Sequence, residues 1–240
     1  AHTEKGGIAC VYENGYISIL KGQWKMRVEK VLNIPLTFSG KAGFMIQNVL
    51  AATLAAFVHG TKIQDIRAGL TTFVPNIAQT PGRLNLIEMG QFSVLIDYAH
   101  NPHGVEAFCR FISKLNYPSK TLVFGGTGDR RDSDIRRMGQ LASSHFNRFI
   151  VKEDDDRRGR VIGEAAKLII EGILSSRPEA NFIEISSEEE AILYALENAQ
   201  LGELVVLLGD DIWRTARLVS ESREQLIPVQ VEELDIPNKR

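Results

Sequence analysis

From residue 84 onward the sequence alternates short apolar runs with longer amphipathic segments, and this alternation limits the folds available to the chain. The apolar runs predict strands, and the segments between them predict helices. Strands are predicted at 92–97, 120–125, 148–152, 181–185 and 203–208, and helices at about 103–115, 133–146, 160–174, 187–199 and 212–226. Such alternation forms βαβ units, so the predicted fold class is α/β, with a mostly parallel sheet.

The first third of the chain has a different pattern, in which strands come first. Residues 8–12 and 16–21 alternate on either side of Glu13-Asn14-Gly15, and Asn-Gly in that position is a strong hairpin signal. A third strand is predicted at 25–31. These residues therefore predict a small antiparallel sheet.

Two helices and a linker follow this predicted sheet. Residues 44–59 are apolar and alanine-rich and end at Gly60, as expected of a buried helix with a glycine C-cap. Residues 63–73 predict a second, amphipathic helix. Residues 74–83 contain two prolines and a glycine without periodicity, which indicates a linker, so we expect two domains at 1–79 and 80–240.

Composition excludes some classes of function and bounds others. The 240 residues are 44% hydrophobic and 24% charged, with a net charge of −2, so the charge balance gives no indication of binding to nucleic acid or to a membrane surface. Cys10 and Cys109 have no metal-ligand spacing and lie in apolar surroundings, which indicates buried free thiols in a reducing compartment. We therefore expect a cytoplasmic protein. The chain starts at Ala1 and reaches a predicted strand almost at once, as a fragment would.

The first candidate site follows the strand predicted at 92–97. This strand ends in Asp97, His100 and Asn101, and Pro102 then opens a helix. Ligands of open α/β sheets bind at the carboxyl ends of strands, where a carboxylate, an imidazole and an amide together can hold a sugar, a base or a metal-bound phosphate. A capped strand-to-helix turn without any ligand explains the same residues equally well.

A glycine-rich loop follows the next predicted strand. Its backbone N–H groups could approach an anion at the start of the following helix. The residues of this loop that we expect near a site are Gly126, Gly128, Asp129, Arg130 and Arg131. The alternative is a tight turn in which Asp132 or Ser133 caps the helix. The sequence contains no GxxxxGK[ST] phosphate loop, so we do not expect this chain alone to hold and cleave ATP.

An acidic run and a group of arginines follow the third predicted strand. Four consecutive carboxylates repel one another unless cations offset their charge. As substrate-binding residues we consider Glu153, Asp154, Asp155, Asp156, Arg158 and Arg160. The acids could hold a cationic substrate, and the arginines a carboxylate or a phosphate. Alternatively, the arginines neutralise the acids within the loop.

Two further residues are candidates because of their position. Arg83 lies at the predicted hinge, from which it could reach a phosphate when the domains close or make an ordinary surface ion pair. Asn48 lies within the apolar helix at 44–59, where an unpaired amide would cost about 1–3 kcal/mol. It therefore needs a backbone or ligand partner there.

Taken in order, these segments resemble the carboxyl-terminal half of Mur-ligase-like enzymes, and most closely the cyanophycin synthetase family. The resemblance rests on GGIACVYENGYISILKG, FMIQNVLAATLAAF, TPGRLNLIEMGQFSVLIDYAHNP, GGTGDRRD and IVKEDDDRRGR, and covers the chain up to about residue 208. It implies that 1–79 is the end of a Mur ligase central ATP-binding domain without its P-loop. It also implies that 80–240 is the Rossmann-like carboxyl-terminal lid domain.

The same resemblance implies an activity. The family forms amide bonds with ATP through an acyl phosphate, and cyanophycin synthetases attach arginine to the aspartate side chains of a poly-aspartate backbone. The resemblance places Asn48 near the adenine. It implies that Arg83, Asp97, His100 and Asn101 contact the nucleotide. Catalytic roles are implied for Arg83, Asp97 and His100. The acidic loop then holds the incoming arginine, whose guanidinium suits a carboxylate grip.

The resemblance also implies partners and leaves alternatives open. The cofactors expected are ATP and Mg²⁺, with the Mg²⁺ ligands mainly outside this chain and no metal ligands within it. The expected partners are arginine, an aspartate polymer, the missing amino-terminal part of the same enzyme and further copies of it in a homo-oligomer. A non-catalytic module that binds nucleotide or arginine, and a Mur-like ligase for another amino acid, remain alternatives.

Overall fold

The amino-terminal unit pairs a small antiparallel sheet with two helices, as the sequence predicts. In the computed structural model, which describes residues 2–226, β1 (Ile8–Glu13), β2 (Tyr16–Lys21) and β3 (Trp24–Lys30) form the sheet, with α1 (Gly43–Val58) and α2 (Ile63–Thr72) against it. Short 3₁₀ helices occupy Thr3–Lys5, Val31–Asn33 and Pro35–Thr37. Asn14 and Gly15 have positive φ angles of 48° and 80°, as a two-residue hairpin turn requires.

Helix α1 is less buried than its apolar sequence predicts. It ends at Val58 before Gly60, whose φ is 93°, so the predicted end of the helix is confirmed. Within the helix, however, only Met45, Ile46, Val49 and Thr53 are buried. A helix that is apolar around most of its circumference normally has neighbours on all sides, whereas one side of α1 is exposed here.

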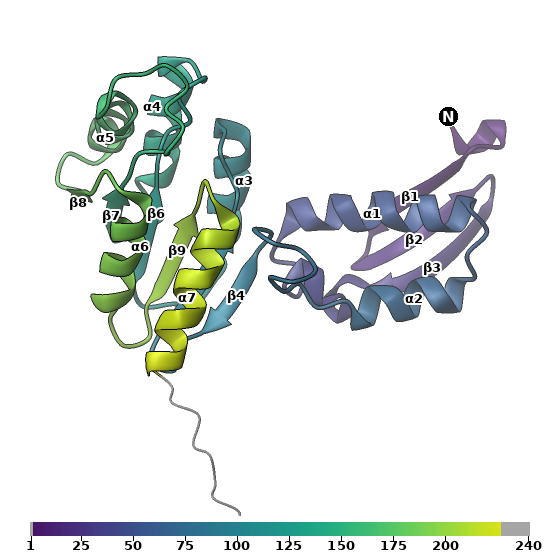
Figure 1. The fold of residues 1–240 in the computed structure, drawn as a ribbon. Helices are drawn as coiled ribbons and strands as arrows, with labels where there is room; N and C mark the ends of the chain where they lie inside the picture. The colour runs from purple at the N-terminus through teal and green to yellow at the C-terminus, as the bar shows by residue number, and fades with distance from the viewer. Residues whose placement is uncertain (1, 227–240) are drawn as a thin grey trace, which may run out of the picture.

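The second unit is a six-stranded sheet covered by helices on both faces (Figure 1). Its strands lie in the order β4-β5-β9-β6-β7-β8, in which β4 pairs antiparallel with β5 and the other neighbours are parallel. The strands are β4 (Asn85–Glu88), β5 (Ser93–Asp97), β6 (Lys120–Phe124), β7 (Arg148–Val151), β8 (Asn181–Glu184) and β9 (Leu204–Leu208). The predicted α/β class with a mostly parallel sheet is therefore confirmed.

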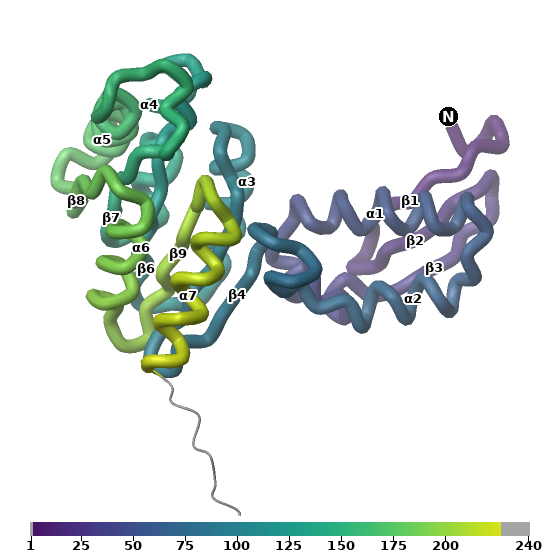
Figure 2. Tube along the Cα trace, in the orientation of Figure 1, coloured from purple at the N-terminus to yellow at the C-terminus, as the bar shows by residue number. Residues whose placement is uncertain are grey.

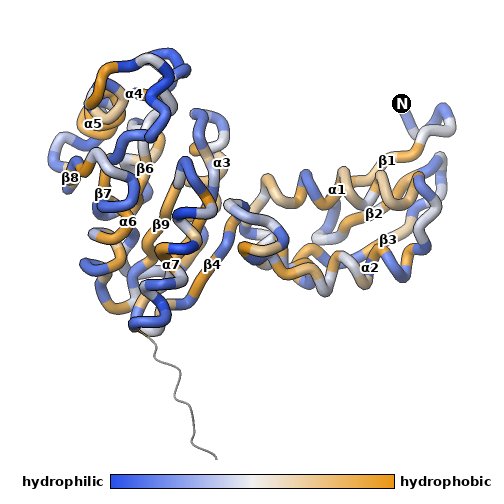
Figure 3. Tube along the Cα trace, viewed as in Figure 1, coloured by the Kyte–Doolittle hydropathy of each residue, from blue (hydrophilic) through white to orange (hydrophobic). Residues whose placement is uncertain are grey.

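The helices of this unit separate by face. They are α3 (Pro102–Ile112), α4 (Asp132–Ala142), α5 (Glu164–Ser176), α6 (Glu188–Glu197) and α7 (Ile212–Leu226). Leu95, Leu122 and Val206 point to one core with α3, α4 and α5, whereas their neighbours along the strands point to a second core with α6 and α7. This burial on both faces explains the continuous apolar strands, which Figure 3 shows between hydrophilic loops.

The sequence prediction missed one strand. β4 has only four residues and lies at the edge of the sheet, beside β5. The linker predicted at 74–83 contains neither helix nor strand, while the division into domains at 79 and 80 stays a prediction. The loose end predicted after Pro228 lies outside the described residues.

The two units meet at the start of α1 and the side of α3 (Figure 2). The ring of Phe111 of α3 forms edge-to-face contacts with Phe38 and with Phe44. The ring centroids are 5.1 Å and 6.3 Å apart, respectively. Ala42 and Met45 belong to the same core as the sheet of the second unit. An aromatic contact therefore joins the two units beside the linker.

Candidate functional site

The carboxyl ends of four parallel strands surround a small hollow. The loops after β5, β6, β7 and β9 contribute Tyr98, Ala99, His100, Gly125, Thr127, Asp154, Leu208, Gly209 and Asp210 to its lining. Because β9 inserts between β5 and β6, the chain reverses direction in the sheet here, and ligands of open α/β folds bind at such a point. The fold thus brings together the three loops that the sequence singled out.

Asp97 is almost completely buried at the end of β5, with 6% of its surface exposed. Its Oδ2 accepts a hydrogen bond of 3.1 Å from the backbone N–H of Leu84. Burial raises the pKa of Asp97 to about 6, although the Leu84 bond and the charge of Arg83 oppose that shift. A carboxylate is therefore kept beside the hinge at some cost in stability.

The hinge around Arg83 has a defined geometry. Leu84 has a φ of 50°, and Gly82, with a φ of 66°, donates its N–H to Asn85 at 2.8 Å. The amide of Asn85 also donates to the carbonyl of Thr80 at 2.9 Å. The guanidinium carbon of Arg83 lies 5.7 Å from the centroid of the Tyr98 ring. Arg83 is therefore directed toward the polar end of β5.

His100 and Asn101 differ in how far the protein already uses them. His100 is half-buried, and its Nδ1 lies 2.9 Å from the carbonyl oxygen of Tyr98. In the neutral ring this contact places the proton on Nδ1 and leaves Nε2 as an acceptor. Asn101 is the N-cap of α3, because its Oδ1 accepts the N–H of Gly104 at 2.9 Å. The capping role that the sequence left open is therefore observed for Asn101.

The glycine-rich loop packs against backbone on its inner side. A Cβ at Gly125 would lie 2.5 Å from the carbonyl oxygen of Lys152, and one at Gly128 only 2.0 Å from that of Arg157. Gly126 is similarly close to Ile135, at 2.7 Å. These glycines therefore allow two neighbouring loops to approach each other.

The arginines at the end of the acidic run hold these two loops together. Arg160 donates to the carbonyl oxygens of Gly128 at 2.8 Å and Arg130 at 2.6 Å, and it pairs with Asp132 at 2.9 Å. Arg158 pairs with Asp129 at 2.6 Å. The alternative from the sequence was that these arginines neutralise the acids of their own run. Arg158 reaches Asp156 only at 4.0 Å, and the shorter ion pairs of both arginines are with Asp129 and Asp132, outside the run.

The expected cap of α4 is not formed. The helix begins at Asp132, and its N-cap residue, Arg131, makes no side-chain capping bond. The carboxylate of Asp132 instead pairs with Arg160, which lies on the facing loop. The prediction that Asp132 or Ser133 caps this helix is therefore wrong, because a tertiary ion pair competes for the carboxylate.

The acids of the run occupy different environments. Glu153 is buried and accepts the N–H of Ala166 at 2.9 Å in the first turn of α5. Asp155 and Asp156 keep 62% and 80% of their side-chain surface exposed, whereas Asp154 keeps 10%. Only Asp154 of these four lines the hollow.

A buried ion cluster, which the sequence did not reveal, supports this part of the site. Lys152 is 1% exposed, and its Nζ lies 2.6 Å from both Asp154 and Glu188. Burial alone would lower the pKa of Lys152, but these two carboxylates hold it above its usual value. Arg214 of α7 forms ion pairs with both Glu188, at 3.1 Å, and Asp155, at 2.5 Å. Glu188 and Arg214 lie 36 and 62 residues from Lys152 in the chain, so no local motif could have identified the cluster.

Asp210 completes the acidic side of the hollow. Burial raises the pKa of its carboxyl above the usual value, and the charge of Asp154 raises it further. The two carboxylates therefore favour a cation between or beside them, and only one of them is bound to Lys152. A position directly after an apolar strand was the signal that could have identified Asp210.

Asn48 lies apart from this hollow, on α1 of the other unit. Its side chain is exposed, and its Nδ2 lies 3.5 Å from the sulfur of Met45. The expectation that Asn48 needs a partner to offset burial is therefore wrong, because the exposed face of α1 leaves it accessible to water. Asn48 lines a separate, mainly apolar hollow between α1 and α2.

The described residues also bear on metals and membranes. Among residues 2–226 no group of three or more His, Cys, Asp or Glu side chains could hold a metal ion. Two of the carboxylates at the strand ends already bind Lys152, so this set does not fit Mg²⁺. None of the helices in the same range has the length and apolar character needed to cross a bilayer.

Comparison with known proteins gives relatives over most of the chain. Residues 82–210 match the family model for the Mur ligase glutamate ligase domain. A cyanophycin synthetase from Crocosphaera subtropica is 50% identical over 220 residues, which cover 91% of this chain and 25% of that protein. One from Nostoc sp. is 48% identical over 218 residues, covering 91% and 24%. The chain thus spans about a quarter of the length of these curated relatives.

More distant relatives and solved structures agree with this result. A UDP-N-acetylmuramoyl-L-alanyl-D-glutamate–2,6-diaminopimelate ligase from Caldanaerobacter subterraneus is 32% identical over 69% of this chain and 33% of its own length. E. coli FolC, solved with ADP and without folate substrate, superposes with a TM-score of 0.64 at 17% identity over 91% of this chain and 47% of its own. That likeness shows a shared fold.

Proposed function

The chain belongs to the Mur ligase family, and from that premise we propose that it is the carboxyl-terminal part of an ATP-dependent ligase that attaches arginine to the side chains of an aspartate polymer. It supplies the lid that binds the incoming amino acid. The identity to cyanophycin synthetases supports this choice of substrates. In this proposal, the other parts of the ligase, including the phosphate loop, correspond to the portion of the relatives that this chain does not span.

The proposal rests mainly on Asp154 and Asp210, which line one hollow at the strand ends. Burial, and after it the charge of Asp154, raises the pKa of Asp210, and a guanidinium placed there would offset the repulsion between the two carboxylates. Its planar N–H groups can donate to both carboxylates, which an ammonium group does less well. Asp155 pairs with Arg214, Asp156 is mostly exposed, and Glu153 is engaged in capping α5, so Asp154 is the acid of the run that this proposal uses.

The ion cluster below the hollow fixes Asp154 in place. Lys152 and Glu188 are both 1% exposed, so the geometry of Asp154 is set before any ligand arrives. Preorganised groups of this kind lose less entropy on binding than mobile surface side chains. The cluster therefore favours one orientation of the bound amino acid.

Amide formation in this proposal takes two balanced steps. An aspartate carboxylate of the polymer attacks the γ-phosphorus of ATP, which yields an acyl phosphate and ADP. The α-amine of arginine, after losing its proton, attacks the acyl carbon, and phosphate leaves. Closure of the lid excludes water that would otherwise hydrolyse the acyl phosphate.

The nucleotide contacts proposed for this chain lie at the hinge end of the site. Arg83 donates to the phosphates, Asp97 accepts from the ribose, and the acceptor Nε2 of His100 and the amide of Asn101 lie beside them. Asn48 contributes from α1 next to the adenine. Mg²⁺, held outside this chain, offsets phosphate charge when bound.

Calorimetry of the chain with arginine and with citrulline tests the amino acid site. Citrulline has nearly the shape of arginine without its charge, so we expect it to bind much more weakly. Asp210→Asn removes one charge-assisted contact, worth about 1.5–3 kcal/mol, and should weaken arginine binding roughly ten- to hundredfold. Asp65→Asn, an exposed change on α2, is the matched control and should have no effect.

A chimera tests the activity itself. In the Crocosphaera relative, this chain would replace the 220-residue segment that it matches. We expect ATP-dependent incorporation of arginine into an aspartate polymer, reduced by Asp210→Asn. Preferential incorporation of lysine or of an acidic amino acid would contradict the assignment of arginine.

A further inference from the structure

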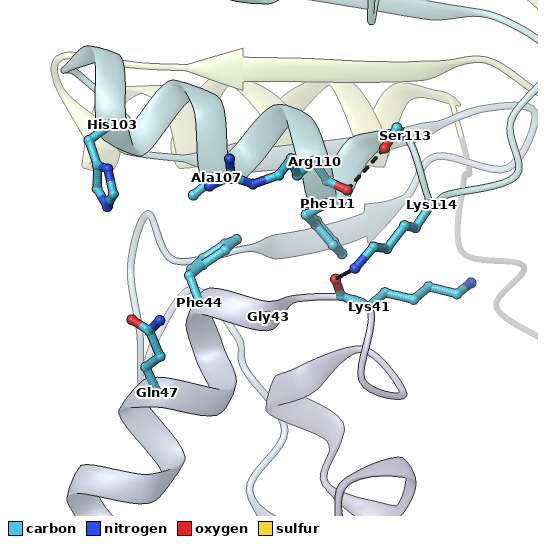
Figure 4. Close-up of a pocket in the computed structure, with 10 residues that line it drawn as sticks. All are labelled: Lys41, Gly43, Phe44, Gln47, His103, Ala107, Arg110, Phe111, Ser113 and Lys114. Atoms are coloured by element: carbon cyan, nitrogen blue, oxygen red, sulfur yellow. Dashed lines mark hydrogen bonds between the residues drawn. The ribbon is translucent and has the colours of Figure 1, made fainter. Parts of the chain in front are cut away.

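A hollow between the two units lies away from the strand ends. It has a volume of about 480 Å³ and is bounded on one side by the start of α1 and on the other by the length of α3 (Figure 4). We refer to it as the junction cleft, lined by Lys41, Phe44, Gln47, His103, Arg110 and Lys114, among others. Among residues 2–226 no acidic side chain lines it, although the whole chain has a net charge of −2.

The cations of the junction cleft are available to a ligand. The ammonium group of Lys41 makes no ion pair or hydrogen bond among the described residues. Lys114 uses one of its three N–H bonds, to the carbonyl oxygen of Lys41 at 3.2 Å. Arg110 pairs only with Glu106, at 3.2 Å on the exposed side of α3. Such an exposed pair is weak and can exchange partners.

The start of α1 adds positive potential to the same cleft. The helix is 16 residues long and begins at Gly43, which is part of the lining, and no side chain caps it. The partial positive charge of a helix N-terminus therefore adds to the lysines and Arg110. Together they indicate a site for an anion.

The lining residues on α3 favour an extended ligand. His103, Ala107, Arg110 and Lys114 recur every three or four residues, so they form one stripe along α3 and the turn after it, on which Arg110 and Lys114 are the cations. This stripe is about 16 Å long, and an extended peptide of about five residues spans the same length. Side chains on one side of such a peptide recur about every 7 Å, close to one helical turn.

From this juxtaposition we propose that the junction cleft binds a carboxylate-rich peptide, which runs along α3 between the two units. If the proposed function is correct, this peptide is the aspartate polymer, held outside the reaction centre. The carboxylates meet Arg110 and Lys114 on this stripe and Lys41 on the other side of the cleft. Phe44 and Phe111 provide an apolar surface for the side-chain methylene groups of the peptide.

Fluorescence anisotropy with a labelled oligo-aspartate peptide tests this assignment at low salt. We expect the chain to bind this peptide and not oligo-asparagine, and binding to weaken as salt rises. The double substitution Lys41→Gln with Lys114→Gln should weaken binding about tenfold. Lys62→Gln with Lys167→Gln removes the same charge from exposed positions outside the cleft and should have little effect.

Three results would overturn the assignment: no binding of oligo-aspartate by the unmodified chain, equal weakening in both double variants, or displacement of the peptide by equimolar ATP. The last result would make the cleft a nucleotide site. All four substituted lysines are exposed, and an unchanged urea unfolding curve confirms that each variant is folded. Arginine binding is measured in a separate experiment. If the chain bound arginine but not the peptide, the peptide site in the junction cleft would be refuted and the proposed function would not.

Discussion

At the scale of single residues, Asp97, the proposed ribose contact, shows how burying a carboxylate can cost stability. Its carboxylate is buried at the end of β5 and accepts one hydrogen bond from Leu84. Burial raises its pKa to about 6, against about 3.9 in an unfolded chain. The folded state therefore binds a proton more tightly than the unfolded state between these two values.

This difference predicts how stability depends on pH. As pH rises from about 3 to about 7, the unfolded chain releases the proton first, so the free energy of unfolding falls by about 3 kcal/mol through Asp97. Asp97→Asn keeps an acceptor for Leu84 without a charge, so the variant should match the original chain near pH 4 and exceed its stability at pH 7. Urea unfolding at several pH values measures both.

Asp97→Ala is the complementary variant. Compared with Asp97→Asn, which is also uncharged, it leaves the N–H of Leu84 without its acceptor, which should cost about 1–3 kcal/mol at every pH. If the original chain and Asp97→Asn lost stability in parallel between pH 4 and pH 7, another group would be responsible. Glu188 is not that group, because Lys152 holds its pKa below the usual value.

The sequence was enough to predict which polar residues follow the strand that ends at Asp97. It was not enough to predict what the side chains of the site contact. The strand followed by Asp97, His100 and Asn101 was visible because polar residues end an apolar run. The roles of Glu153 and Lys152 depend on Ala166 and Glu188, which lie 13 and 36 residues further along the chain. Burial decides between a free carboxylate and a cap, and burial is set by the whole fold.

At the scale of elements, the periodicity of the sequence predicted most helices and strands correctly. β4 was missed because four residues at a sheet edge carry too little periodicity to distinguish them from a loop. The exposed face of α1 was missed for another reason. An apolar, alanine-rich sequence indicates that a helix packs on many sides, but it does not indicate which neighbours are present.

The crossing of α4 and α5 gives an element-scale prediction. A Cβ on Gly172 would lie 2.0 Å from the carbonyl oxygen of Arg136, and one on Gly139 2.2 Å from that of Ile169. Gly172→Ala should therefore destabilise the chain by about 1–3 kcal/mol through overpacking, although alanine favours a helix by about 1 kcal/mol. Urea unfolding followed by circular dichroism measures the change.

Gly69 of α2 provides the matched control for this substitution. A Cβ there would meet nothing within 4 Å, and its φ is not positive. Gly69→Ala should thus show only the gain in helix propensity, about 0.5–1 kcal/mol of added stability. Equal effects of the two substitutions would show that α4 and α5 do not cross as closely as described.

At the scale of the whole molecule, the two units are joined by a linker and by a contact in which Phe38 and Phe44 pack against Phe111. Phe44 lies in the first turn of α1, against Phe111 of α3, while Phe57 near the other end of α1 stacks with Trp24 inside the amino-terminal unit at 6.3 Å. A substitution at Phe44 therefore tests the coupling between the two units, whereas one at Phe57 tests the stability of the amino-terminal unit. If one unit moves as a lid, the contact between the units must be weak enough to break.

Phe44→Ala should loosen the junction and leave the core of each unit intact. We expect faster hydrogen exchange in α3 on the side that contains Ala107 and Phe111, and easier proteolysis within 74–83, because the linker then bears the connection. Phe57→Ala should instead raise exchange in β1–β3 and α2 and leave α3 unchanged. If both variants affected α3 equally, the units would unfold as a single cooperative body, and the aromatic contact would not be the joint between them.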